Sequence, residues 1–119
     1  MYNRGMKTGN DKSREYVQVV CTAGTAEEAE RIARAVVEQR LAACAQIIAP
    51  VQSIYWWRGA VEQSTEWMCV MKTKGEKFEE VRRVIRALHT YETPEIIATP
   101  IIRGDEAYLG WIEEEAGGR

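Results

Sequence analysis

The sequence predicts an α+β fold whose elements follow the order β-α-β-β-α-β, with one more helix at the C-terminus. Residues 16–22 alternate in polarity in the way that a half-buried strand does. Residues 43–57 and 60–73 are two strand-like runs around a tight break at Arg58 and Gly59, which predicts a hairpin. Two other segments carry apolar side chains at helical spacing. At 119 residues, the chain has the length of a single domain.

A capping-box pattern precedes each of the two main predicted helices. Thr25 stands three residues before Glu28, and Thr73 stands three residues before Glu76. After Thr25, an apolar stripe follows at i, i+3, i+4, i+7 and i+8: Ala29, Ile32, Ala33, Val36 and Val37. After Thr73, the stripe consists of Phe78, Val81, Ile85 and Leu88. Asp105 is expected to cap the short helix near the C-terminus.

The positions of the prolines agree with one particular strand order. Pro94 introduces a last predicted strand at residues 95–102. In a ferredoxin-like fold, also called split βαβ, the strand order 4-1-3-2 places the second and fourth strands at the sheet edges. Pro50 and Pro100 fall in those two strands, where a missing N–H is tolerated. The sequence therefore predicts a ferredoxin-like sandwich with a long hairpin between its second and third strands.

Composition excludes several classes of protein. A content of 45% hydrophobic and 29% charged residues is that of an ordinary soluble domain. The net charge of -2, without a cluster of Lys and Arg, argues against nucleic-acid binding. The apolar runs are far shorter than the ~20 residues that cross a bilayer, so no membrane association is expected. Residues 1–14 are polar and are expected to form a disordered tail, followed by a single domain at 15–119.

The cysteines argue against a disulfide scaffold. Cys21, Cys44 and Cys69 are an odd number and contain no C-x-x-C pair. Reduced thiols in a cytoplasmic protein are the simpler interpretation. Cys69 lies between Met68 and Val70 and is expected to pack in the core as a small hydrophobic side chain.

Motifs of common enzyme classes are missing from the sequence. It contains no Gly-rich phosphate loop, no H-E-x-x-H zinc motif and no G-x-S-x-G nucleophile elbow. Carboxylate pairs are too common, at 29% charged residues, to indicate acid–base catalysis. We therefore predict a non-enzymatic protein.

The length of the hairpin predicts self-association. Arms of about 14 residues extend about 46 Å, whereas a helix of about 15 residues covers only about 22 Å. The part of the hairpin beyond the helices is expected to carry the aromatic residues Tyr55, Trp56, Trp57 and Trp67. Because large aromatic side chains are enriched at interfaces, a homo-oligomer formed through the hairpin is expected. The alternative is that the terminal helix, with Trp111, folds back over this part.

Five strings, in order between Tyr16 and Ile112, resemble the CutA family of divalent-cation tolerance proteins: Leu41-Ala-Ala-Cys-Ala45, Ser53-Ile-Tyr-Trp-Trp-Arg-Gly59, Met71-Lys-Thr73, His89-Thr-Tyr-Glu-Thr-Pro-Glu-Ile-Ile97 and Tyr108-Leu-Gly-Trp-Ile112. The resemblance implies a ferredoxin-like protomer and a tight homotrimer similar in architecture to PII-type signalling proteins. It also implies a role in tolerance of copper and other divalent metal ions. The family's usual His-Pro-Tyr-Glu-Val-Pro-Glu string appears here with Thr90 and Thr93 at two positions.

The metal-ligand candidates are Cys21, Cys44 and His89. Thiolate and imidazole suit copper and zinc, and divalent affinities peak at copper. None of the three has a diagnostic ligand spacing, so a site would be assembled in space, within or between protomers. The alternative for the two cysteines is core packing. The alternative for His89 is a donor that faces the last carbonyls of the second helix.

The likeness to the CutA family also implies a pocket between protomers, with these lining residues: Tyr55, Trp57, Glu66, Lys72, His89, Tyr91, Glu92 and Glu95. Its carboxylates would complete a metal site, pair with Lys72, Arg58 or Arg103, or stay solvated. A copper-binding trimer that contributes to metal tolerance is the favoured function. One alternative is a PII-like sensor that binds a small anion or metabolite in this pocket and depends on Lys72 rather than on the thiols. Another is a mainly structural trimer whose metal binding is incidental.

Overall fold

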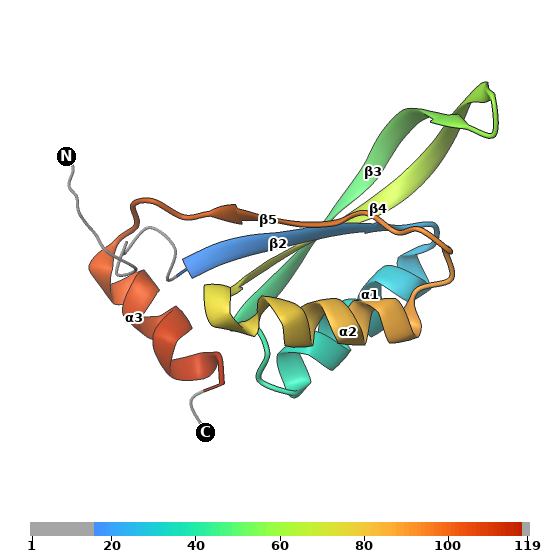
Figure 1. The fold of residues 1–119 in the computed structure, drawn as a ribbon. Helices are drawn as coiled ribbons and strands as arrows, with labels where there is room; N and C mark the ends of the chain where they lie inside the picture. Colours follow the sequence, from blue (N-terminus) through green and yellow to red (C-terminus); the bar gives the residue numbers. More distant parts are fainter. Residues whose placement is uncertain (1–15, 118–119) are drawn as a thin grey trace.

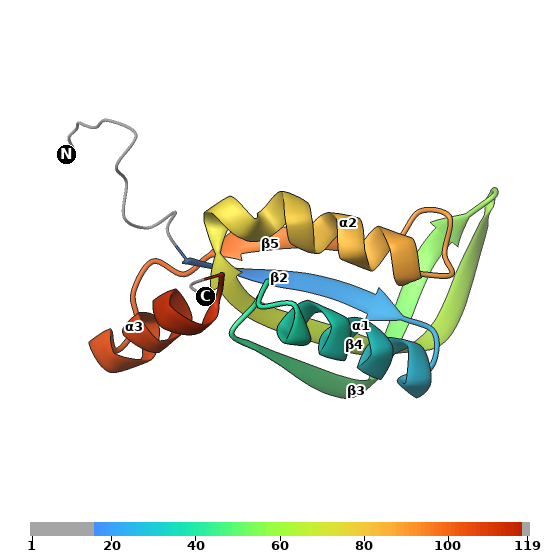
Figure 2. The same cartoon turned by 90° about the horizontal axis from the view of Figure 1, so that it is seen from below.

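Four antiparallel strands form one sheet in the order β3-β4-β2-β5, and two helices cover one of its faces (Figures 1 and 2). The computed structural model describes residues 16–117, so the predicted tail at residues 1–14 lies outside the described residues. The elements are β2 (Tyr16–Ala23), α1 (Ala26–Glu38), β3 (Cys44–Trp57), β4 (Ala60–Lys74), a 3-10 turn (Gly75–Lys77), α2 (Phe78–Leu88), β5 (Ile96–Pro100) and α3 (Glu106–Glu115). The predicted α+β, ferredoxin-like order is confirmed.

Pro50 and Pro100 both lie in edge strands, as predicted. Pro50 falls where the pairing of β3 with β4 shifts register, between Ile48 and Val51. Pro100 is the last residue of β5. Both sites therefore tolerate a residue that cannot donate to the ladder.

The core lies between the sheet and helices α1 and α2. Alternate residues of β4, namely Cys69, Met71 and Thr73, are buried on the helix-facing side. The buried apolar side chains that form this core are Val17, Val19, Cys21, Ala23, Ala29, Ile32, Val36, Ala42, Cys69, Met71, Val81 and Ile85. The apolar stripes predicted for the two helices therefore face the sheet.

The β3–β4 hairpin extends well beyond the two helices (Figure 1). Its tip turns through Arg58 and Gly59, which both have positive φ, as a tight two-residue hairpin turn requires. On this extension Trp56 is 74% exposed. Trp67 was expected on the same extension, but it lies opposite Ala23 and packs against the core.

Helix α3 lies at the end of the sheet opposite the hairpin tip (Figure 1). Lys74, the last residue of β4, donates to Glu113 of this helix at 3.0 Å. Arg40, just after α1, forms an ion pair with Glu115. The terminal helix therefore does not fold back over the extended hairpin.

Two of the three predicted helix caps are present. Thr25 accepts a hydrogen bond from the backbone N–H of Glu28, and Asp105 accepts from Ala107 and Tyr108. The capping box predicted at Thr73 is wrong, because Thr73 is still within β4 and its hydroxyl donates to the carbonyl of Leu41 at 2.6 Å. The long strand continues to Lys74, and a 3-10 turn then leads into α2.

Candidate functional site

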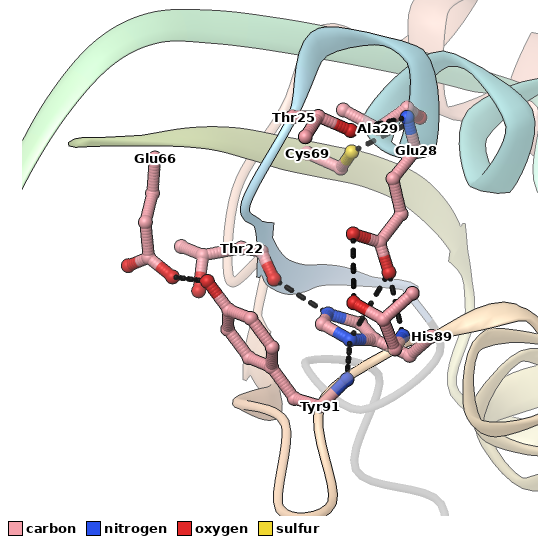
Figure 3. Close-up of polar contacts among 9 residues, drawn as sticks. Thr22, Thr25, Glu28, Ala29, Glu66, Cys69, His89 and Tyr91 are labelled. Carbon is pink, nitrogen blue, oxygen red and sulfur yellow. Dashed lines mark hydrogen bonds and ion pairs between the residues drawn. The ribbon is translucent and has the colours of Figure 1, made fainter. Parts of the chain in front are cut away.

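The loop after α2 turns back to the end of β2 and contacts residues of β2, α1 and β4 (Figure 3). We call these residues the His89–Tyr91 cluster: Thr22 of β2, Glu28 of α1, Glu66 of β4, and His89, Thr90 and Tyr91 of the loop. The helix ends at His89, whose backbone is extended; its N–H makes the last helical hydrogen bond, to the carbonyl of Ile85 at 2.8 Å.

Both ring nitrogens of His89 are used inside the protein. Its side chain is fully buried. Nε2 lies 2.6 Å from the carbonyl oxygen of Thr22, and Nδ1 accepts from the backbone N–H of Tyr91 at 3.1 Å. This pairing requires the tautomer that carries its proton on Nε2, so Nε2 donates to Thr22. The predicted contact of the imidazole with the last carbonyls of its own helix is therefore not formed; the ring binds β2 instead.

Glu28 is a buried carboxylate that joins α1 to the same loop. It accepts from the backbone N–H of Thr90 at 2.7 Å and from the Thr90 hydroxyl at 3.2 Å. Its Oε2 also lies 3.4 Å from Nδ1 of His89. The capping-box pattern gave Glu28 a role only at the start of the helix. Its burial could have been predicted, because Glu28 precedes Ile32 by four residues and so shares the buried face of the helix.

Tyr91 passes the end of β2 and reaches β4. Its hydroxyl donates to Oε2 of Glu66 at 2.8 Å, while the hydroxyl of Ser53 donates to Oε1 at 2.6 Å. Glu66 is only 6% exposed, and both of these partners are neutral hydroxyls. Burial and the hydrogen bond to this carboxylate raise the pKa of Tyr91. A Cβ added to Gly24 would lie 3.1 Å from the Tyr91 hydroxyl oxygen, so a larger residue here would press on the Tyr91 side chain.

The predicted pocket residues fall into separate groups in one protomer. Glu66 and Tyr91 are in direct contact, and the phenol of Tyr55 lies near enough to Tyr91 to contribute to its raised pKa. Lys72 lies six positions further along β4 than Glu66, about 20 Å at strand spacing, and bonds Gln46.

The other predicted pocket residues lie outside this contact. Trp57 is at the hairpin tip, where the guanidinium of Arg58 stacks on its ring at 5.1 Å. Glu92 and Glu95 are exposed on the loop. A pocket that includes all of the predicted residues would therefore need a second protomer.

The three metal-ligand candidates also lie apart. Cys21 is buried opposite Cys69 of β4. Cys44 is partly exposed at the start of β3, and its sulfur lies 3.7 Å from the hydroxyl oxygen of Tyr108. His89 belongs to the cluster described above. Within residues 16–117, no three His, Cys, Asp or Glu side chains are grouped so that they could hold a metal ion.

No helix in the described part of the chain is both long and apolar enough to cross a membrane.

Comparisons with known proteins agree with the fold and with the predicted family. Residues 17–115 match the family model of the CutA1 divalent ion tolerance protein. The divalent-cation tolerance protein CutA of Archaeoglobus fulgidus is 48% identical over 96 residues, which cover 81% of this chain and 93% of that protein. A solved structure of the Thermus thermophilus protein has a TM-score of 0.84 at 40% identity and covers 86% of this chain and 99% of the other. The chain therefore belongs to the CutA1 family of divalent ion tolerance proteins.

Proposed function

We propose that this protein contributes to divalent-cation tolerance in the cytoplasm as a non-enzymatic homotrimer, and that it binds copper or a similar metal ion between protomers. The family supports the link to divalent cations. The observation that carries the assembly is the long β3–β4 hairpin, which projects away from the core and carries exposed apolar side chains (Figure 1).

The hairpin supports assembly because one of its faces carries large exposed apolar side chains. Trp56 lies opposite Val61, and Ile54 is two residues before Trp56, so the three side chains share a face. Ile54 is 68% exposed and Val61 is 57% exposed. Exposed apolar patches of this kind mark sites of protein association. A closed, symmetric assembly of identical chains would cover this face in every protomer.

Cys44 is the best-placed thiol for an inter-protomer metal site. It is partly exposed on an edge strand, whereas Cys21 is buried and His89 has both nitrogens hydrogen-bonded. The exposed carboxylates of Glu92 and Glu95 lie at the other end of the sheet from Cys44, because their loop packs on the end of β2 while Cys44 pairs with Lys72. These ligands would therefore meet only across a boundary between two protomers.

Native mass spectrometry tests metal binding directly. We expect the purified protein to form trimers that take up stoichiometric Cu(II) or Cu(I), and we expect Cys44→Ser trimers to lose this uptake. Cys21→Ser serves as the matched thiol control and is expected to keep it. Trimers that ignore copper, or that bind it equally well after Cys44→Ser, would contradict the metal-site proposal and leave the assembly proposal standing.

A separate variant tests the assembly. Trp56→Lys places a charge on the uncovered hairpin face and should shift the protein from trimers to monomers in the same spectra. Arg83→Glu, at an exposed position of α2, is the control and should remain trimeric. If Trp56→Lys is still fully trimeric at low protein concentration, the hairpin is not the interface.

A further inference from the structure

Two cysteines face each other across the centre of the sheet. Cys21 of β2 and Cys69 of β4 are directly opposed in the antiparallel pairing, and both are fully buried. The S–H of Cys69 donates to the carbonyl of Ala29, with the atoms 3.5 Å apart. We propose that this pair is a redox modification site, which a hydroperoxide converts into a cross-strand disulfide between β2 and β4.

The strand geometry suits this bond. Directly opposed residues of antiparallel strands have Cα atoms about 4.5–5.5 Å apart. A disulfide accepts Cα separations of about 4.4–6.8 Å. Both side chains are buried on the same face of the sheet at directly opposed positions, so formation of the bond requires only side-chain movement. Cys44 has no such partner position, since it lies opposite Lys72.

The reaction balances with one peroxide for each pair of thiols. The thiolate of Cys69 attacks one oxygen of hydrogen peroxide, the O–O bond breaks, and a sulfenic acid forms at Cys69 as hydroxide leaves and takes up the thiol proton. The sulfur of Cys21 then attacks the sulfenic sulfur, loses its own proton, and displaces the second oxygen as water. Two thiols and one peroxide thus give one disulfide and two water molecules.

The surroundings favour this order of steps. The interaction between the two thiols lowers the pKa of Cys69 and raises that of Cys21, so we assign the first attack to Cys69; the products are the same if Cys21 attacks first. Both sulfurs are buried, so the peroxide reaches them only when the sheet opens locally. We therefore expect the pair to react more slowly than the partly exposed Cys44.

Peptide mapping of the full chain tests the proposal. The protein is treated with hydrogen peroxide, denatured in the presence of N-ethylmaleimide without reductant, and digested with trypsin. Cleavage after Lys and Arg places the cysteines on three different peptides: 15–31, 41–58 and 59–72. The expected product is peptide 15–31 joined to 59–72, lighter than the two free peptides by two hydrogen atoms and separated again by dithiothreitol.

Two variants distinguish this link from one formed by thiol exchange during denaturation. Cys44→Ser removes the thiol that could take part in such exchange and should keep the link in full. Cys69→Ser should abolish it. If Cys69→Ser does not fold, the peptide maps of the wild type and of Cys44→Ser still show whether the link between Cys21 and Cys69 forms. The proposal is overturned if Cys21 and Cys69 remain alkylated after Cys44 has been oxidised, or if either becomes a sulfinic acid while no link forms.

Discussion

The hydroxyl of Tyr91 donates to Oε2 of Glu66 at 2.8 Å and thereby joins the loop after α2 to the central strand β4. Glu66 is buried, and its other carboxylate oxygen is bound by the hydroxyl of Ser53. The contact therefore links the loop, the sheet and the base of the hairpin. A substitution at any of these residues should therefore weaken the hydrogen bonds of the others.

Removal of the Tyr91 hydroxyl should destabilise the protein. Tyr91→Phe leaves an oxygen of the buried Glu66 carboxylate without its donor, at a cost of about 1–3 kcal/mol. Urea unfolding at fixed protein concentration measures this loss. Tyr55→Phe is the matched control and should cost less, because the Tyr55 hydroxyl binds Ser64 at 3.3 Å on the exposed hairpin. Equal losses in the two variants would contradict the importance of the contact with Glu66.

Two glycines should respond to alanine in opposite directions. A Cβ at Gly24 meets the Tyr91 hydroxyl oxygen at 3.1 Å, so we expect Gly24→Ala to push this hydroxyl, which is bound to Glu66, and to lower the thermal midpoint. Gly110 lies inside α3 with open space around its position. Gly110→Ala should therefore stabilise the protein by about 0.5–1 kcal/mol, the usual gain within a helix. Differential scanning calorimetry on both variants checks the signs.

The buried Glu28 carboxylate should matter far more than its exposed neighbour. Glu28→Ala leaves the backbone N–H of Thr90 without an acceptor, and we expect a loss of about 1–3 kcal/mol together with faster amide exchange at Thr90. Glu27→Ala, at an exposed position of the same helical turn, should change stability by less than about 0.5 kcal/mol. Unchanged exchange at Thr90 in Glu28→Ala would show that another group holds this loop.

The docking of α3 should weaken in acid. The hydrogen bond from Lys74 lowers the pKa of Glu113, so the contribution of Glu113 is present above the unfolded carboxyl pKa and is lost as pH falls through its lowered folded value. Glu113→Gln should flatten this part of the stability–pH curve, by no more than about 1 kcal/mol for a half-exposed pair.

A double-mutant cycle checks this assignment. If Lys74 and Glu113 act as a pair, Lys74→Gln combined with Glu113→Gln should lose less stability than the sum of the two single variants. Strict additivity would show that the two charges act independently.

Thr90 illustrates what a local pattern cannot reveal. Its backbone N–H and its hydroxyl both bind Glu28. The two hydrogen bonds depend on the packing of α1 against the loop, and α1 lies far from Thr90 along the chain.

The elements of this fold were determined by the sequence alone wherever the signal is local. Helical spacing after Thr25, the caps at Thr25 and Asp105, and the two edge prolines each act within a few residues, so the order of strands and helices could be predicted. The tertiary structure decided the contacts that depend on strand register and on how layers pack. It placed Thr73 inside a strand rather than at a helix cap, because the long β4 continues past it to pair with β2. It also set Cys21 against Cys69, since direct opposition depends on the register between strands that are distant in sequence.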